Sequence, residues 1–287
     1  MTDNLVDLVR AELGAPVDAR VTRLAEAIAA KHGAASRAVL FYGSCLREAQ
    51  LDGLMLDFYL IVSDYRAAYD KRWLALANRL IPPNVFPFEA DGLAAKYAVL
   101  SEADFHRLNG PETRGVSVWA RFAQPSRLVW ASDETARERS VAAVARAAPT
   151  LLGSALPPLT PLADELDMWR RAFALTYSAE LRAERKGRSG SVVDADPDRY
   201  RRFTAPAMAL AVPGTSGWTR RRIEGKALSV ARLAKASATF AGGVDYIAWK
   251  INRHAGTQIE IKPWQRRHPL LAAISLLPRL LRSGAIR

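Results

Sequence analysis

The feature that most constrains this fold is a pair of apolar runs, Ala38–Tyr42 and Leu54–Val62, separated by a polar segment. Both runs are short and rich in aliphatic and aromatic residues, so each predicts a buried strand. Gly43 and Ser44 directly follow the first run and predict a turn. The second run carries one acid, Asp57. A carboxylate in such a strand needs a partner or an open cleft, because its uncompensated burial is costly.

A strand, a Gly-Ser turn and a second strand bearing a carboxylate form an arrangement suited to a nucleoside triphosphate. Gly43 allows the backbone to come close to the phosphates. The Ser44 hydroxyl and the amides of the turn can bind phosphate oxygens. Asp57 can hold a divalent cation that bridges these oxygens. The pattern is typical of nucleotidyl transfer sites, and the alternative is an ordinary turn followed by an edge-strand acid that faces water.

A second acid often lies two residues after the first in such sites, on the same face of the strand. Here that position is Tyr59. The nearest other candidate is Asp64, which follows the strand. Asp64 is equally suited to cap the next helix, so the sequence leaves its role as a metal ligand or as a cap open.

Five segments of this chain resemble, in order, patterns of one protein family. They are Phe41–Cys45, Leu56–Phe58, Ile81–Phe86, Lys96–Val99 and Ala120–Pro125. The corresponding patterns run YGSG, a hydrophobic-D-F strand, LPPNV, KYG and an AGRxxKP-like segment. They belong to the mitochondrial-type CDP-diacylglycerol synthases, which are phosphatidate cytidylyltransferases of the translocator assembly and maintenance family.

The resemblance covers Ala38–Val129 and, more weakly, Phe203–Arg253. Three residues depart from the family patterns. Cys45 replaces the second glycine of GSG, which is acceptable if this position does not have a positive φ. Ala98 replaces the glycine of KYG, and Gln124 replaces the lysine before Pro125. The last change removes a potential phosphate contact.

The resemblance implies an α+β fold with a polymerase-β-like nucleotidyltransferase domain and a mainly helical, winged-helix-like second domain. It implies transfer of CMP from CTP to phosphatidate, which gives CDP-diacylglycerol and pyrophosphate, with Mg²⁺ as cofactor. Transfer to a different acceptor and a non-catalytic, membrane-associated homologue are the alternatives. The implied site residues are Asp57, Lys96 and Arg121 for catalysis, Gly43, Ser44 and Cys45 for nucleotide binding, and Asp57 with Asp64 for the metal.

Composition and length favour a globular protein of more than one domain. The chain has 287 residues, of which 49% are hydrophobic and 24% charged. The stretch from Pro149 to Pro158 contains several Pro residues and a Gly residue and suggests a domain boundary. We therefore expect domains over residues 1–150 and 159–265. The single cysteine excludes an intramolecular disulfide, and the four scattered histidines do not predict a zinc site.

The net charge of +12 predicts an anionic partner. Basic residues concentrate between Arg220 and Arg267, which suits nucleic acid, an acidic membrane or phosphorylated molecules. Residues 266–287 include the apolar segment Leu270–Arg282 with basic flanks, which predicts a membrane-surface helix or a helix docked on the core. The N-terminus does not resemble a signal peptide, and no apolar run is long enough to span a membrane. We therefore expect a cytoplasmic protein at the inner face of a membrane, without a stable nucleic-acid partner.

Overall fold

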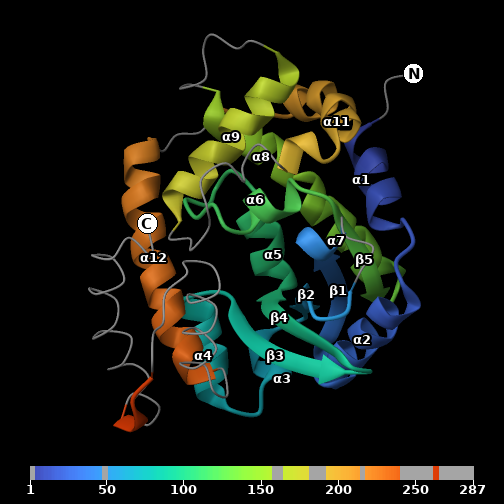
Figure 1. Cartoon of the computed structure of the whole chain (residues 1–287), viewed down its shortest axis with the longest axis vertical. Coiled ribbons are helices and arrows are strands. Elements are labelled where there is room, and N and C mark those ends of the chain that lie inside the picture. The colour runs from blue at the N-terminus through green and yellow to red at the C-terminus, as the bar shows by residue number, and fades with distance from the viewer. Residues whose placement is uncertain are drawn as a thin grey trace.

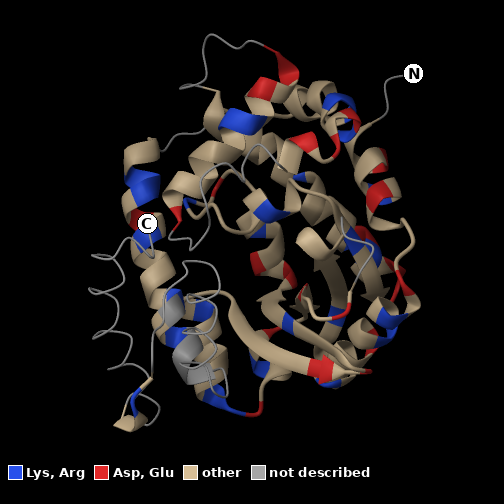
Figure 2. Ribbon diagram, viewed as in Figure 1, with Lys and Arg blue, Asp and Glu red and all other residues tan. Residues whose placement is uncertain are grey.

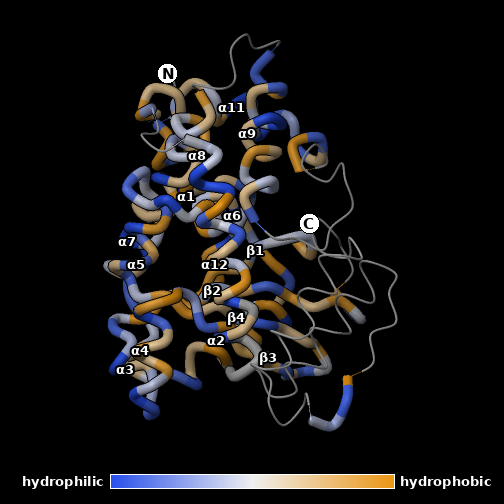
Figure 3. The backbone as a smooth tube through the Cα atoms, turned by 90° about the vertical axis from the view of Figure 1, so that its left-hand side faces the viewer, coloured by the Kyte–Doolittle hydropathy of each residue, from blue (hydrophilic) through white to orange (hydrophobic). Residues whose placement is uncertain are grey.

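The computed structural model describes residues 4–46, 51–156, 164–180, 192–213, 217–239 and 261–264. Helices surround one β-sheet (Figure 1). Figure 3 shows that the central strands are largely hydrophobic, whereas blue hydrophilic segments are frequent on the surrounding helices. The chain is therefore an α+β protein, as expected. Among the described residues, no helix is long and apolar enough to cross a membrane.

The sheet has five strands in the order β3-β4-β2-β1-β5. Strands β2 and β4 are parallel, and the other neighbouring pairs are antiparallel. Both strands predicted from the first two apolar runs are present. The bounds are β1 Ser36–Tyr42, β2 Met55–Val62, β3 Asn84–Ala90, β4 Leu93–Ser101 and β5 Ser126–Ala131.

One face of the sheet packs against helices from both ends of the chain in a single cluster of buried residues. Its helices are α1 Leu5–Leu13, α5 Glu102–Asn109, α6 Trp119–Phe122, α7 Glu134–Ala145, α8 Ala147–Ala155, α9 Glu165–Ala179 and α11 Pro197–Ala209. The other face packs against α2 Ala19–Ala30, α3 Tyr65–Ala68 and α4 Arg72–Leu80. Helix α12, Trp218–Thr239, contacts α9 and β3. Short 3₁₀ turns, η1 Gly33–Ala35 and η2 Ser44–Leu46, precede and follow β1.

The expected domain boundary at residue 150 falls inside α8. Every residue of this helix is buried, and its apolar side chains belong to the same cluster as the sheet residues and the later helices. The Pro and Gly residues that suggest a linker, Pro149 and Gly153, are therefore part of a buried helix. Because Pro149 lies in the first turn of α8, it replaces an N–H that has no partner within the helix.

Two further differences concern elements near the candidate site. The helical spacing of apolar residues predicts a single helix from Tyr65 to Leu80. The structure divides it into α3 and α4, because Tyr69 has an extended backbone. The apolar run Tyr97–Leu100 predicts a strand that Lys96 opens, but Lys96 lies inside β4, which begins at Leu93. Helical patterning predicts a helix over Val244–His254, and the winged-helix-like domain that the resemblance implies suits a short strand at Gln258–Ile261. Both, apart from Ile261, lie outside the described residues, as does the segment 266–287.

Candidate active site

Asp57 and Lys96 are directly paired across the parallel strands β2 and β4. Lys96 Nζ lies 2.9 Å from Asp57 Oδ1. The side chains of Lys96 and Asp57 are 24% and 22% exposed, so the pair is reached by solvent while its neighbours are buried. The predicted alternation is confirmed, since Tyr59 and Ile61 pack on the same face as Asp57 and Phe58 packs on the opposite face.

The turn after β1 lies against the Asp57 carboxylate. Tyr42, the last residue of β1, is paired with Asp57, and Gly43 follows it with a φ of 99°. A Cβ atom at Gly43 would lie 3.2 Å from Asp57 Oδ2. Glycine is therefore required here both by the backbone conformation and by the proximity of the carboxylate. The half-buried Ser44 begins η2 beside this turn.

Cys45, expected to bind the nucleotide, is buried in the turn, so only its backbone could contact a ligand there. Its Sγ lies 3.6 Å from the backbone carbonyl oxygen of Met55, at the start of β2. Within the described part of the chain, Asp91 is the only non-glycine residue with a positive φ. Cys45 thus has a backbone conformation that any residue can adopt, so this position does not require glycine.

Arg121 approaches the same face of the sheet from α6. Its Nη1 donates a hydrogen bond of 2.6 Å to the carbonyl of Ser117, and its Cζ lies 5.9 Å from the Tyr42 ring centroid. Burial acts to lower the pKa of Arg121, but the electrostatic effects of Tyr59 and Tyr42 and then of the acids Glu180 and Asp57 outweigh it and raise the pKa. The guanidinium group therefore remains charged near Asp57.

Burial also raises the pKa of Tyr42, and the negative charge of Asp57 raises it further. The phenol therefore stays protonated at neutral pH and is available as a hydrogen-bond donor. Together, Asp57, Lys96, Arg121 and Tyr42 form a site with one acid, two cations and a neutral hydroxyl group.

Helix α12 contributes two further cations that the sequence alone does not assign to the site. Arg232 donates hydrogen bonds to the carbonyl of Pro82 (2.8 Å) and to Ser117 Oγ (2.7 Å). Arg121 donates to the carbonyl of Ser117, so both arginines form hydrogen bonds with the same residue. Lys235 Nζ lies 2.7 Å from the Pro83 carbonyl oxygen and also donates to the Ile81 carbonyl. The sequence indicates a role for these two residues only through the concentration of basic residues late in the chain.

Glu180 is a second acid near these cations. It directly follows α9 and is 8% exposed. Its charge acts to raise the pKa of both Arg121 and Arg232, although burial lowers the pKa of Arg232 overall. The sequence gives no signal for Glu180, because this residue belongs to the half of the chain without resemblance to a catalytic segment.

Asp64 does not join Asp57. It is the N-cap of α3, and its Oδ1 accepts a hydrogen bond of 2.7 Å from the backbone N–H of Arg66. Asp57 and Asp64 lie toward opposite ends of β2, seven residues apart, which corresponds to roughly 23 Å along an extended strand. The expectation that Asp57 and Asp64 share a metal ion is therefore corrected. Asp64 caps a helix, which is the alternative role that the sequence allows.

The side chains present fit a magnesium ion only if it arrives with a nucleotide. Within the described ranges, no three His, Cys, Asp or Glu side chains are grouped to hold a metal. Asp57 offers one carboxylate beside a glycine turn. Mg²⁺ is commonly bound by one or two carboxylates together with substrate phosphates, so this donor set is sufficient for a nucleotide-bound ion. It is not sufficient for an ion held by protein ligands alone.

Comparison with known proteins yields structural matches but no sequence match. No known protein family's sequence profile matches the chain, and no curated protein matches it. Among solved structures, it is similar to a nucleotidyltransferase-like protein from Exiguobacterium sibiricum 255-15. The identity is 10%, the alignment covers 92% of each chain, and the TM-score is 0.29.

Proposed function

We propose that this chain is a nucleotidyltransferase whose active site is centred on Asp57. The observation that supports this most directly is the contact between Gly43 and Asp57, where a turn without a side chain lies beside a strand carboxylate. Lys96 and Arg121 place two cations on the same side of the sheet. A turn that exposes amides, one acid and two cations match the charge distribution of a metal-bound triphosphate.

In the proposed reaction, a phosphate oxygen of the acceptor attacks the α-phosphorus of the nucleotide. A new bond forms between this oxygen and phosphorus, and the bond from the α-phosphorus to the bridging oxygen breaks, so pyrophosphate leaves. Lys96 and Arg121 stabilise the charge that develops on the phosphate oxygens. The acceptor phosphate is already anionic at neutral pH, so the reaction does not require a strong base.

A magnesium ion held by Asp57 would supply further charge neutralisation at the phosphates. The chain's own contribution is to fix the position of the carboxylate. Asp57 is held between its strand neighbours and the Gly43 turn, and Tyr42 and Arg121 stand beside it. This arrangement positions one metal ligand and two phosphate-binding cations on rigid elements.

CTP as the donor and phosphatidate as the acceptor are proposed from the sequence resemblance. The product would be CDP-diacylglycerol, made where the protein meets the inner surface of an anionic membrane. The net charge of +12 supports an anionic partner of this kind.

The test is to mix the full-length protein with Mg²⁺, each nucleoside triphosphate in turn, and phosphatidate liposomes, and to measure pyrophosphate. We expect release with CTP that depends on both Mg²⁺ and phosphatidate. Release that does not depend on phosphatidate would indicate a different acceptor. No release with any triphosphate and acceptor would contradict the proposal.

A non-catalytic homologue is the second candidate, and one observation favours it. Asp57 is paired with Lys96, and Tyr59 occupies the position where a second acid would face the same site. Such a protein would bind nucleotides without turning them over. Calorimetric binding of CTP, combined with undetectable pyrophosphate release under all of the conditions above, would support this candidate.

A further inference from the structure

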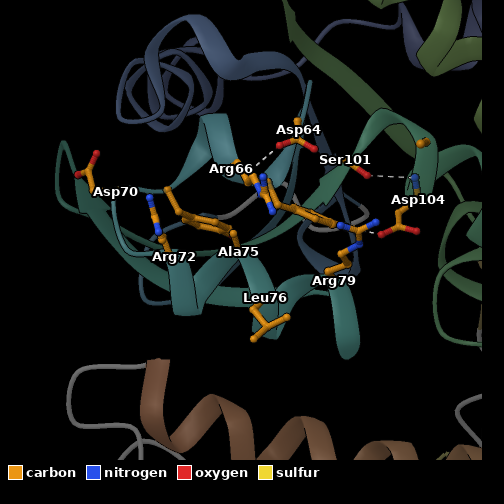
Figure 4. A pocket seen from close by; sticks show the side chains of 12 residues that line it. Asp64, Arg66, Asp70, Arg72, Ala75, Leu76, Arg79, Ser101 and Asp104 are labelled. Atoms are coloured by element: carbon orange, nitrogen blue, oxygen red, sulfur yellow. Dashed lines mark hydrogen bonds between the residues drawn. The ribbon is translucent and has the colours of Figure 1, made fainter.

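A cavity of about 1000 Å³ lies between α3, α4 and the start of α5 (Figure 4). It is located where the parallel strands β2 and β4 end, and its lining includes Asp64 and Ser101 from these ends. The carboxyl ends of parallel strands are frequent positions of ligand sites. Because Asp57 lies toward the other end of β2, this cavity is separate from the candidate active site.

Three arginines line the cavity: Arg66 from α3, and Arg72 and Arg79 from α4. Within the residues that the structure describes, their guanidinium groups make no hydrogen bond or ion pair. Figure 2 shows Lys and Arg residues on α4 and on the neighbouring α12. Guanidinium groups bind phosphate oxygens with paired hydrogen bonds, so an arginine-lined cavity favours a phosphate ligand.

The acids that line the cavity are largely occupied elsewhere. Asp64 accepts a hydrogen bond from the backbone of Arg66 (2.7 Å). Asp104 accepts one hydrogen bond from the Tyr65 hydroxyl (2.6 Å) and another from Arg107 of α5 (2.6 Å). Asp70 lies at the edge of the cavity, and its carboxylate points away from Arg66 (Figure 4). Among the described residues, these carboxylates therefore form no ion pair with the three arginines.

An exposed apolar stripe on α4 meets the cavity at Leu76. Trp73, Leu76 and Leu80 are 48%, 58% and 70% exposed, and Leu76 also lines the cavity. Their spacing of three and four residues places them on one side of the helix. Helical spacing alone predicts that this stripe packs in the core. The break between α3 and α4 explains the difference, because it separates the buried Tyr65 and Tyr69 from the exposed residues that follow.

We propose that this cavity binds the phosphate group of an anionic amphiphile. The arginines contact the phosphate oxygens, and the apolar part of the ligand lies against Leu76. This site goes beyond the proposed function, because it lies at the other end of β2 from Asp57 and needs no nucleotide. Its ligand chemistry is shared by a phospholipid in a membrane and by a free phosphate ester with an apolar chain.

The test is calorimetric titration of the full-length protein with three soluble probes. These are dihexanoyl phosphatidate, glycerol 3-phosphate and dihexanoyl phosphatidylcholine. We expect the phosphatidate to bind most tightly, the glycerol phosphate more weakly and the phosphatidylcholine not measurably. Sedimentation with phosphatidate vesicles then distinguishes membrane lipid from the free ester, since either source supports the site but only a membrane ligand gives binding to vesicles.

Matched variants locate the binding. Arg66→Ala and Arg79→Ala should each weaken phosphatidate binding about tenfold, because each removes a charged hydrogen bond. Arg202→Ala, an exposed arginine on α11, is the control and should bind as the wild type does. Leu76→Ser should weaken binding of phosphatidate more than that of glycerol phosphate. Leu210→Ser, with an equally exposed leucine at the end of α11, should change neither.

The outcomes separate this site from the proposed active site. The effect of Arg79→Ala should persist in an Asp57→Asn background, even if that background has no transferase activity. Equal phosphatidate affinity for wild type, Arg66→Ala and Arg79→Ala would overturn the cavity proposal while leaving the proposed function intact. Equal binding of phosphatidate and phosphatidylcholine would also overturn it, since the site would then not select a ligand with a net negative charge.

Discussion

Lys96 Nζ lies 2.9 Å from Asp57 Oδ1, and the two residues are direct neighbours in the register of the parallel strands β2 and β4. The carboxylate therefore already has a cation beside it before any ligand arrives. A triphosphate that attracts Lys96 would leave Asp57 free to bind a metal. The first prediction concerns this pair.

Lys96→Met should weaken CTP binding and lower the free energy of unfolding by about 1–3 kcal/mol, because it leaves a partly buried carboxylate without its cation. Calorimetry with CTP and a thermal melt measure the two effects. Lys226→Met, which removes an exposed lysine of α12, is the control. Unchanged CTP affinity in Lys96→Met would exclude Lys96 from the nucleotide site.

Gly43→Ala should destabilise the protein and impair nucleotide binding. The φ of 99° is unfavourable for alanine, and the new Cβ would lie 3.2 Å from Asp57 Oδ2. Gly53→Ala is the matched control, because Gly53 also has a positive φ, of 75°, but a Cβ atom there would have no neighbouring atom within 4 Å. We expect both variants to melt earlier and only Gly43→Ala to lose CTP affinity. Equal losses of CTP affinity in the two variants would mean that the contact between Gly43 and Asp57 has no role in nucleotide binding.

Arg232→Gln should loosen α12 from the first half of the chain. The change removes hydrogen bonds to the Pro82 carbonyl and to Ser117 Oγ, at a cost of about 1–3 kcal/mol in unfolding free energy. Hydrogen exchange of α12 amides should increase. Arg222→Gln, which loses only a 3.4 Å contact within the same helix, provides the comparison. Identical exchange in the two variants would contradict the role of Arg232.

Lys235 should make the stability of the protein depend on pH. Burial lowers its pKa from 10.5 to about 7, and the positive charge of Arg232 contributes in the same direction. Between these two values the unfolded chain holds a proton that the folded chain lacks, so the free energy of unfolding rises with pH across this window.

The measurement is the difference in melting temperature between wild type and Lys235→Met from pH 7 upward. The wild type should gain stability relative to the variant as the pH rises from about 7 toward 10.5. A constant difference over this range would show that Lys235 keeps an ordinary pKa.

The strands and the helix caps of the first half could be predicted because they depend on local patterns. Asp18, Ser101 and Asp133 are residue types that favour helix caps, and they cap α2, α5 and α7; each side chain accepts a hydrogen bond from a backbone N–H. The alternation in β2 likewise places Asp57 and Tyr59 on one face. Such features can be predicted because they are determined by a few residues that are adjacent in the sequence.

The remaining features depend on contacts between distant segments. The sequence does not reveal that Arg232 reaches Ser117, since 115 residues separate them. The exposure of Leu76 depends on the break between α3 and α4, where the sequence contains no Pro or Gly that would predict the end of a helix. Pro149 suggests a linker, yet α8 is buried by the later helices. In each case tertiary packing overrides the local signal.

The most direct test of the proposed function is Asp57→Asn, with the melting temperature and the rate of CTP-dependent pyrophosphate release measured on one preparation. Asparagine keeps the shape of the side chain but loses the charge that would hold the metal. Stability should fall by less than the about 3–5 kcal/mol of a fully buried ion pair, because Asp57 and Lys96 are partly exposed. The account predicts a folded protein whose rate is lower by orders of magnitude. A folded Asp57→Asn variant with near-normal turnover would contradict it.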